Sequence, residues 1–162
     1  MQDGIIIHCS ASEFGSSIEI DSWHRQKGWD NIGYHFVICN GKIENNNYLE
    51  CFDGAIERGR DINKYGAHAK GCNNYIGICL IGKKEFTSKQ FENLKILIKA
   101  LIKKYDIKEK NIMGHYNVSS KSCPNFDVED FMKNIKNSNM QNEISISKII
   151  ERLTNLEKIV LN

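Results

Sequence analysis

Three residues that lie far apart in the chain, His8, His115 and Cys123, have side chains that can bind a zinc ion. Two imidazoles and a thiolate are good zinc ligands, and three protein ligands with an open fourth position are typical of a catalytic zinc rather than a structural one. Residues 116–122 read as a loop, which can bring His115 and Cys123 to one point. His8 completes the group if its strand neighbours the strand that precedes His115. The three residues therefore predict a zinc hydrolase.

Two other side chains, those of Lys121 and Tyr34, are suited to work beside such a metal. Lys121 lies two residues before Cys123, so both side chains point the same way if the segment is extended. An ammonium group in that place can stabilise a developing oxyanion. The Tyr34 phenol can hydrogen-bond a tetrahedral intermediate or relay a proton. Two plainer interpretations stay open, namely a solvated surface lysine and an ordinary cross-strand tyrosine.

The hydrophobic patterns predict a mixed α/β domain in which helices flank a central β-sheet. Short apolar and β-branched runs predict strands at residues 5–9, 34–39, 55–57, 76–81 and 111–113. The pair Asn40-Gly41 predicts a hairpin turn after the second of these strands. Residues 42–53 then form an irregular segment or a β-ribbon, and residues 61–74 form a polar loop that contains His68.

Capping residues mark the beginnings of three predicted helices. A capping box at Ser16 opens the first helix, which Gly28 ends. A second capping box at Thr87 opens a helix that runs to about Tyr105, in which apolar residues recur at helical spacing. Asp127 caps the third helix.

The end of the chain has a pattern of its own. We expect one domain over residues 1–137, a linker at residues 138–143 and an amphipathic helix over residues 144–162. Five apolar residues of that helix follow one another at alternating intervals of three and four, like the a/d seam of a coiled coil: Ile146, Ile149, Leu153, Leu156 and Val160. About two heptads do not decide between packing on the chain's own domain and homo-oligomerisation through residues 146–160.

Composition and charge exclude several classes of protein. The 162 residues suffice for one globular domain with a sizeable core, since 41% are hydrophobic and 26% charged. A net charge of +2, from 22 basic and 20 acidic residues, is too balanced to indicate nucleic acid as the main partner. The six cysteines include no CxxC pair, which argues against a disulfide framework. No signal peptide or membrane-spanning run is visible, so we expect synthesis in the cytoplasm without membrane insertion.

Six segments of the chain together resemble a known superfamily. They are IIIHCSAS (5–12), SWHRQKGWDNIGYHFVI (22–38), IERGRD (56–61), GAHAKG (66–71), IGICLIG (76–82) and GHYNVSSKSCPNFD (114–127). In this order they resemble the zinc-dependent N-acetylmuramoyl-L-alanine amidases, or type 2 amidases, of the bacteriophage T7 lysozyme and peptidoglycan recognition protein superfamily. The resemblance spans residues 5–136 and implies the mixed α/β fold of that superfamily.

The resemblance implies an enzyme that cuts the amide bond between N-acetylmuramic acid and L-alanine in bacterial peptidoglycan. It implies a zinc cofactor bound by His8, His115 and Cys123, with Tyr34 and Lys121 as catalytic residues. It also indicates a phage-type endolysin, made in the host cytoplasm and acting on the cell wall after release. The alternative is a peptidoglycan- or protein-binding module of the same fold that does not cleave its ligand.

Other residues acquire expected roles from the same resemblance. His68 and Arg60 fall in stretches that border the substrate groove in the family, so both are expected to bind substrate. His24 is expected to be structural. Residues 40–51 look like an insertion relative to the family and could add a wall to the groove. A structural zinc would need a fourth ligand, for which Cys9 is the candidate, but Cys9 should face away from His8 as its neighbour on a strand.

Overall fold

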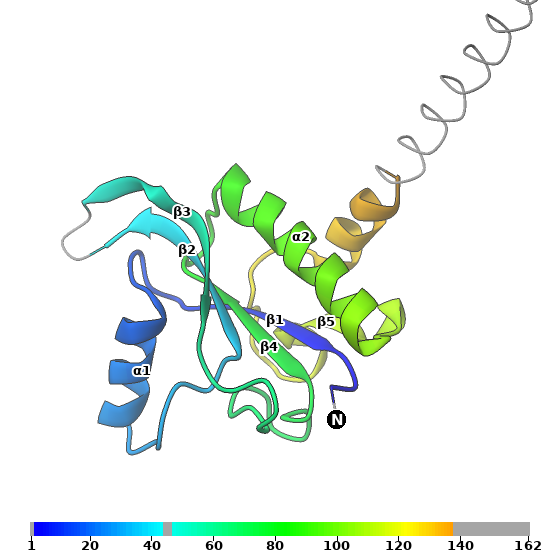
Figure 1. The fold of residues 1–162 in the computed structure, drawn as a ribbon, viewed down its shortest axis with the longest axis horizontal. Helices are drawn as coiled ribbons and strands as arrows, with labels where there is room; N and C mark the ends of the chain where they lie inside the picture. Colours follow the sequence, from blue (N-terminus) through cyan, green and yellow to red (C-terminus); the bar gives the residue numbers. More distant parts are fainter. Residues whose placement is uncertain (1, 44–46, 138–162) are drawn as a thin grey trace, which may run out of the picture. The chain divides into compact units, whose positions relative to one another are not determined.

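A five-stranded mixed sheet forms the centre of the fold (Figure 1). The structure, a computed structural model, describes residues 2–43 and 47–137. The strands lie in the order β3-β2-β4-β1-β5. All neighbouring strands pair in parallel except β2 and β3, which are antiparallel. The strands are β1 (Ile5–Cys9), β2 (Phe36–Lys42), β3 (Tyr48–Arg58), β4 (Ile76–Leu80) and β5 (Ile112–Gly114).

Two longer helices cover opposite faces of this sheet (Figure 1). They are α1 (Ser17–Gln26) and α2 (Ser88–Tyr105). Both begin where the capping signals predict. Thr87 forms a complete capping box with Gln90. Ser16 is an N-cap without the predicted box, because its side chain accepts from the N–H of Ile18 rather than of Glu19. Two short 3-10 helices, η2 (Glu109–Asn111) and η3 (His115–Asn117), flank β5. The predicted mixed α/β fold is therefore confirmed.

The hydrophobic core between α1 and the sheet also supports Tyr34, one of the predicted catalytic residues. Its buried members come from α1, from the segment before β2, from β2, and from β4 and the residue that follows it: Ile20, Ile32, Val37, Cys39, Cys79 and Ile81. Tyr34 and Trp23 pack against this cluster. Because β1 and β4 are parallel with His8 opposite Cys79, the His8 side chain lies on the same face of the sheet as this core.

The predicted zinc site requires the strand of His8 to neighbour the strand that precedes His115. The pairing of β1 with β5 meets this condition. Ile7 pairs with Gly114, so His8 and His115 each follow one of these two paired residues. The three isoleucines of β1, residues 5–7, are completely buried. Such a continuous apolar run is typical of a parallel strand covered on both faces. Burial of these side chains, together with pairing to β4 on one edge and β5 on the other, holds β1 in place.

The predicted hairpin turn at Asn40-Gly41 is wrong. Both residues lie inside β2, where the pairing with β3 is irregular, and Asn40 stands opposite Asp53. Gly41 has φ of +78°, the left-handed conformation that glycine supplies at a β-bulge as readily as in a turn. The Asn40 side chain donates to the carbonyl of Glu13 and accepts from the N–H of Lys42. Asn-Gly therefore stabilises a bulge here, and β3 is one continuous strand.

The end of the chain forms a separate unit. Contacts divide the chain into residues 1–128 and 129–162, and residues 128–137 are helical, as Asp127 predicts. The predicted linker at 138–143, the helix at 144–162 and the seam over 146–160 lie outside the described residues. Within the described part of the chain, no helix has the length and apolarity needed to cross a bilayer.

Gln90 joins α2 to the sheet, and this contact generates a prediction. Its side chain is completely buried, and its Nε2 donates to the carbonyls of Ile38 and Ile81 at 2.9 Å each. Gln90→Met would remove the hydrogen-bond partner of the Ile81 carbonyl and of the Thr87 N–H. The Ile38 carbonyl would keep only its bond from the Ile81 N–H. We expect the free energy of unfolding to fall by about 2–4 kcal/mol in urea denaturation.

Glu92→Met is the matched control for this substitution, because Glu92 is an exposed residue of the same helix. We expect that change to stay within about 0.5 kcal/mol of the parent protein. Equal losses in the two variants would contradict the role assigned to Gln90.

Candidate metal centre

The side chains of His8, His115 and Cys123 converge on one point. Each offers one ligand atom, and the three atoms lie within 4.8 Å of one another. His8 belongs to β1, His115 is the first residue of η3, and Cys123 lies in the loop that follows. The rings of His8 and His115 are 4.5 Å apart between centroids. The His8 imidazole thus comes from β1, and the His115 imidazole comes from η3, which follows the neighbouring strand β5.

Backbone hydrogen bonds hold the Cys123 loop against β1. The Tyr116 N–H donates to the carbonyl of Cys123 at 2.9 Å, which closes the loop between the two ligand candidates. The Cys9 N–H donates to the Cys123 sulfur at 3.2 Å. A backbone donor of this kind stabilises a thiolate. The last residue of β1 therefore positions the sulfur beside His8.

The three side chains open into a cavity of about 500 Å³. The site lies at the carboxyl ends of β1 and β5, the edge at which open parallel sheets commonly bind ligands. Aromatic and basic side chains line the same cavity: Trp23, Trp29, Tyr34, Lys27 and Lys121. The site is thus accessible to a ligand larger than an ion. This access suits a centre with an open coordination position.

Tyr34 and Lys121 both line this cavity, but they stand in different environments. The Tyr34 ring lies 5.0 Å from the His8 ring and packs on the core. Burial, together with the nearby Cys79, Cys123 and Cys9 thiols, raises the pKa of Tyr34 well above its ordinary value. Its hydroxyl therefore keeps its proton and is a hydrogen-bond donor at neutral pH. Lys121 is exposed at the rim.

The candidate ligand histidines are held in their neutral form. Burial first, and then the neighbouring His68, His115 and Lys121, lower the pKa of His8 well below its ordinary value. Burial and Lys121 also lower the pKa of His115. A neutral imidazole has the lone pair that a metal requires. The surroundings therefore favour metal binding over protonation at both rings.

The two thiols beside the site share a hydrogen bond. It lowers the pKa of Cys9 to about 7 and raises that of Cys123, because one proton serves both sulfurs. Cys9 was expected to face away from His8. At the end of β1, however, its thiol lies close enough to contact that of Cys123. Within the described residues, Cys9 does not belong to the group of ligand atoms that His8, His115 and Cys123 form.

His68 lies directly behind His8. The loop between β3 and β4 carries it there, and His68 Nδ1 is 3.0 Å from His8 Nε2. Burial lowers the pKa of His68 to about 4. His68 also contributes to the cavity wall. The motif GAHAKG drew attention to this residue, but nothing in its spacing indicated a contact with His8.

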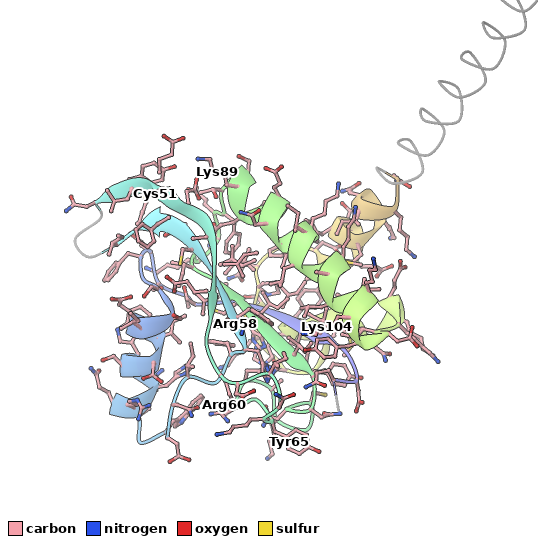
Figure 2. All side chains as sticks on the ribbon, in the orientation of Figure 1. Cys51, Arg58, Arg60, Tyr65, Lys89 and Lys104 are labelled. Carbon is pink, nitrogen blue, oxygen red and sulfur yellow. The ribbon has the colours of Figure 1, made fainter. Side chains whose placement is uncertain are left out.

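Arg60 does not line this cavity. Its side chain donates to two backbone carbonyls, from Nε to Ile32 at 2.8 Å and from Nη1 to Tyr65 at 2.9 Å. Figure 2 shows Arg60 near Tyr65 at the loop that follows β3. The arginine thus ties this loop to the segment before β2. None of the described residues between 40 and 51 lines the cavity either.

His24 has a structural environment, as expected. Its Nδ1 accepts a hydrogen bond from the Gly33 N–H at 3.0 Å, and its ring lies 4.4 Å from that of Trp29. It thereby supports the turn that leads into Tyr34. Trp29 and Lys27 also line the cavity, although no motif singled them out. Both lie within the segment SWHRQKGW, whose aromatic and basic content was the available signal.

Comparisons with known proteins agree on one family. The N-acetylmuramoyl-L-alanine amidase family matches residues 2–126. The endolysin of Escherichia phage T7 is 36% identical over 139 residues, which cover 78% of this chain and 83% of the relative. Peptidoglycan-recognition protein SC2 of Drosophila melanogaster is 31% identical over 115 residues, which cover 67% of this chain and 56% of that protein.

A solved structure extends the agreement to three dimensions. The N-acetylmuramoyl-L-alanine amidase LysC from Clostridium intestinale URNW aligns with a TM-score of 0.69 and 30% sequence identity. The alignment covers 83% of this chain and 85% of that structure. Sequence and fold thus point the same way, and the chain belongs to the N-acetylmuramoyl-L-alanine amidase family.

Proposed function

We propose that this protein hydrolyses the amide bond between N-acetylmuramic acid and L-alanine in bacterial peptidoglycan, as an endolysin, with a zinc ion held by His8, His115 and Cys123. Membership of the amidase family and similarity to phage endolysins support the reaction. The single observation that carries the site is the convergence of the three ligand atoms within 4.8 Å at the wall of an open cavity.

The donor set fits zinc on chemical grounds. Two nitrogens and one sulfur suit this ion, and three protein ligands leave a position for water or substrate. The imidazoles are held neutral by burial. The Cys9 thiol raises the pKa of Cys123, and a bound metal cation would deprotonate this sulfur. A zinc ion bound there would supply a Lewis acid for the scissile carbonyl and would acidify water.

Lys121 and Tyr34 act on the charge that develops in the substrate. The Lys121 ammonium at the cavity rim attracts the carbonyl oxygen as it becomes negative. The Tyr34 hydroxyl, whose pKa is raised by burial, donates a hydrogen bond and does not serve as a base. Both groups line the cavity with His8. Both groups can therefore reach a substrate bound in this cavity.

The cavity lining also suits a glycopeptide. Trp23 and Trp29 offer apolar ring surface, and Lys27 and Lys121 offer positive charge. A muramyl peptide presents sugar-ring C–H groups and peptide carboxylates, which pair with these two kinds of surface. Lys27 and Trp29 are thus proposed contacts of the substrate, in addition to the catalytic residues.

The reaction is tested by mass spectrometry of purified peptidoglycan after digestion with the zinc-loaded protein. We expect free stem peptides that begin with L-alanine, together with intact glycan chains. His115→Ala removes one proposed ligand and should give neither product. Cut sugars would contradict the amidase assignment. A protein that binds zinc but releases no product would instead be a non-catalytic binding module.

Lys121→Met tests the role of the ammonium group, since it keeps most of the aliphatic stem and removes the charge. We expect kcat/KM to fall by about 10²–10³-fold, the cost of losing one oxyanion-stabilising group, while the zinc content stays the same. Lys110→Met is the matched control at an exposed lysine outside the cavity. Equal activities of the two variants would make Lys121 an ordinary surface lysine.

The lowered pKa values of the histidines predict how stability depends on pH. Unfolded histidine takes up a proton near pH 6.5, whereas folded His68 does so only near pH 4. Between these values the unfolded chain binds more protons, so the free energy of unfolding of the metal-free protein decreases as the pH falls. Urea denaturation with a chelator present measures this decrease.

Carboxylates also titrate in this pH range and change the free energy of unfolding, so the effect of His68 must be separated by comparison with a variant. His68→Leu removes one of the shifted groups and should lose less stability than the parent protein between pH 6.5 and about 4. Parallel profiles for the two proteins would contradict the assigned shift.

A further inference from the structure

A chain of two hydrogen bonds runs from His8 away from the candidate metal centre. His8 Nε2 lies 3.0 Å from His68 Nδ1. On the other side of the same ring, His68 Nε2 lies 3.0 Å from the carbonyl oxygen of Tyr75. Both nitrogens of His68 are therefore engaged, one with a side chain that faces the site and the other with the backbone just before β4.

The carbonyl decides where the protons are. A carbonyl oxygen can only accept, so His68 Nε2 carries a hydrogen. A neutral imidazole has one such hydrogen, which leaves His68 Nδ1 as an acceptor. His8 Nε2 must then be the donor, and His8 Nδ1 keeps its lone pair. This nitrogen is 3.9 Å from the Cys123 sulfur and thus faces the other ligand atoms.

We infer that His68 is a positioning residue, which selects the tautomer and the ring orientation of His8 so that Nδ1 points at the metal. This inference rests on the proposed zinc site. Metal-binding histidines commonly donate their second ring N–H to an acceptor, and this partner strengthens the metal site. Here the acceptor is a second imidazole, whose own tautomer is set by the Tyr75 carbonyl.

The surroundings of His68 hold its ring in one place. A Cβ atom on Gly66 would lie 2.3 Å from His68 Cδ2, and one on Gly77 would lie 2.5 Å from the same atom. Both glycines therefore provide the space that the ring fills. The backbone is fixed as well, because the His68 N–H donates to the Asn73 side chain at 3.0 Å. Turning the ring would break its hydrogen bonds with His8 and the Tyr75 carbonyl.

This geometry gives His68 a role other than the substrate contact expected for a residue of the cavity wall. A groove residue would act by contact with the ligand and would affect KM. A positioning residue acts through His8 and affects how strongly the metal is bound. The ring lies edge-on to His8, with an interplanar angle of 82° and centroids 4.9 Å apart. It is thus placed to orient that imidazole.

Two substitutions at His68 separate these roles. His68→Leu has a similar volume but lacks an acceptor, whereas His68→Asn retains a side-chain oxygen near the position of Nδ1. The control is His35→Asn. His35 is a buried histidine near His68 that bonds the Lys64 carbonyl and the Gly77 N–H, with no hydrogen bond to a candidate ligand.

Zinc affinity is measured by competition with a chromogenic chelator, and ring protonation by two-bond ¹H–¹⁵N NMR of the metal-free protein. We expect the wild-type His8 to carry its hydrogen on Nε2. His68→Leu should raise the zinc dissociation constant by about 10–100-fold and give His8 a mixture of tautomers. His68→Asn and His35→Asn should both stay close to the wild-type affinity.

Two results would overturn the inference: a hydrogen on His8 Nδ1 in the wild-type protein, or equal zinc affinities for His68→Leu and the wild type. An equal loss in His35→Asn and His68→Leu would also reject it, since general destabilisation would then explain both. A wild-type protein that binds no zinc would reject the proposed function instead. The tautomer of His8, read in the metal-free protein, would then decide this inference alone.

Discussion

The parallel pairing of β1 with β4 and β5 is the constraint on which the site depends. It places His8 beside the residue that follows β5, and it buries the isoleucines of β1 completely. A strand held on both edges and both faces has little freedom, so the imidazole at its end is positioned by the core itself. The Cys123 loop is then tied to this strand by the bond from the Cys9 N–H to the Cys123 sulfur.

Electrostatics and burial act together on the candidate ligand histidines, His8 and His115. Removal from water disfavours the imidazolium, and the Lys121 ammonium disfavours it further. The same lysine faces the cavity, where a substrate oxygen would develop negative charge. One cation can therefore serve two needs, because it repels a proton from the proposed metal ligands and would attract the charge of the reacting group.

The core beneath α1 fixes both the position and the protonation of Tyr34. Tyr34 packs against buried residues of α1, β2 and β4 while its ring faces His8. Burial raises its pKa, so the packing that stabilises the fold also determines that the phenol is a donor. Arg60 and His24 help to position Tyr34 indirectly, because they form hydrogen bonds with the backbone of residues 32 and 33. These contacts hold the segment that presents Tyr34.

Local elements and donor types were accessible from the sequence. Capping residues at Ser16 and Thr87 and the apolar runs of β1 and β4 predicted elements that the structure confirms. The three ligand candidates followed from their chemistry and motifs. The Asn40-Gly41 turn failed because the same left-handed glycine stabilises a bulge inside a strand. Local preference does not distinguish these two settings.

Side-chain chemistry and local patterns were enough to identify side chains that could bind a metal and segments that would form helices or strands. The fold alone sets three other features: the contact of His68 with His8, the absence of Arg60 from the cavity wall, and the contact of Cys9 with the Cys123 sulfur. The hydrogen-bond partners involved lie 28 or more residues apart, so their meeting depends on strand order and register. Hydrophobic periodicity and capping signals, which act over a few residues, do not encode these.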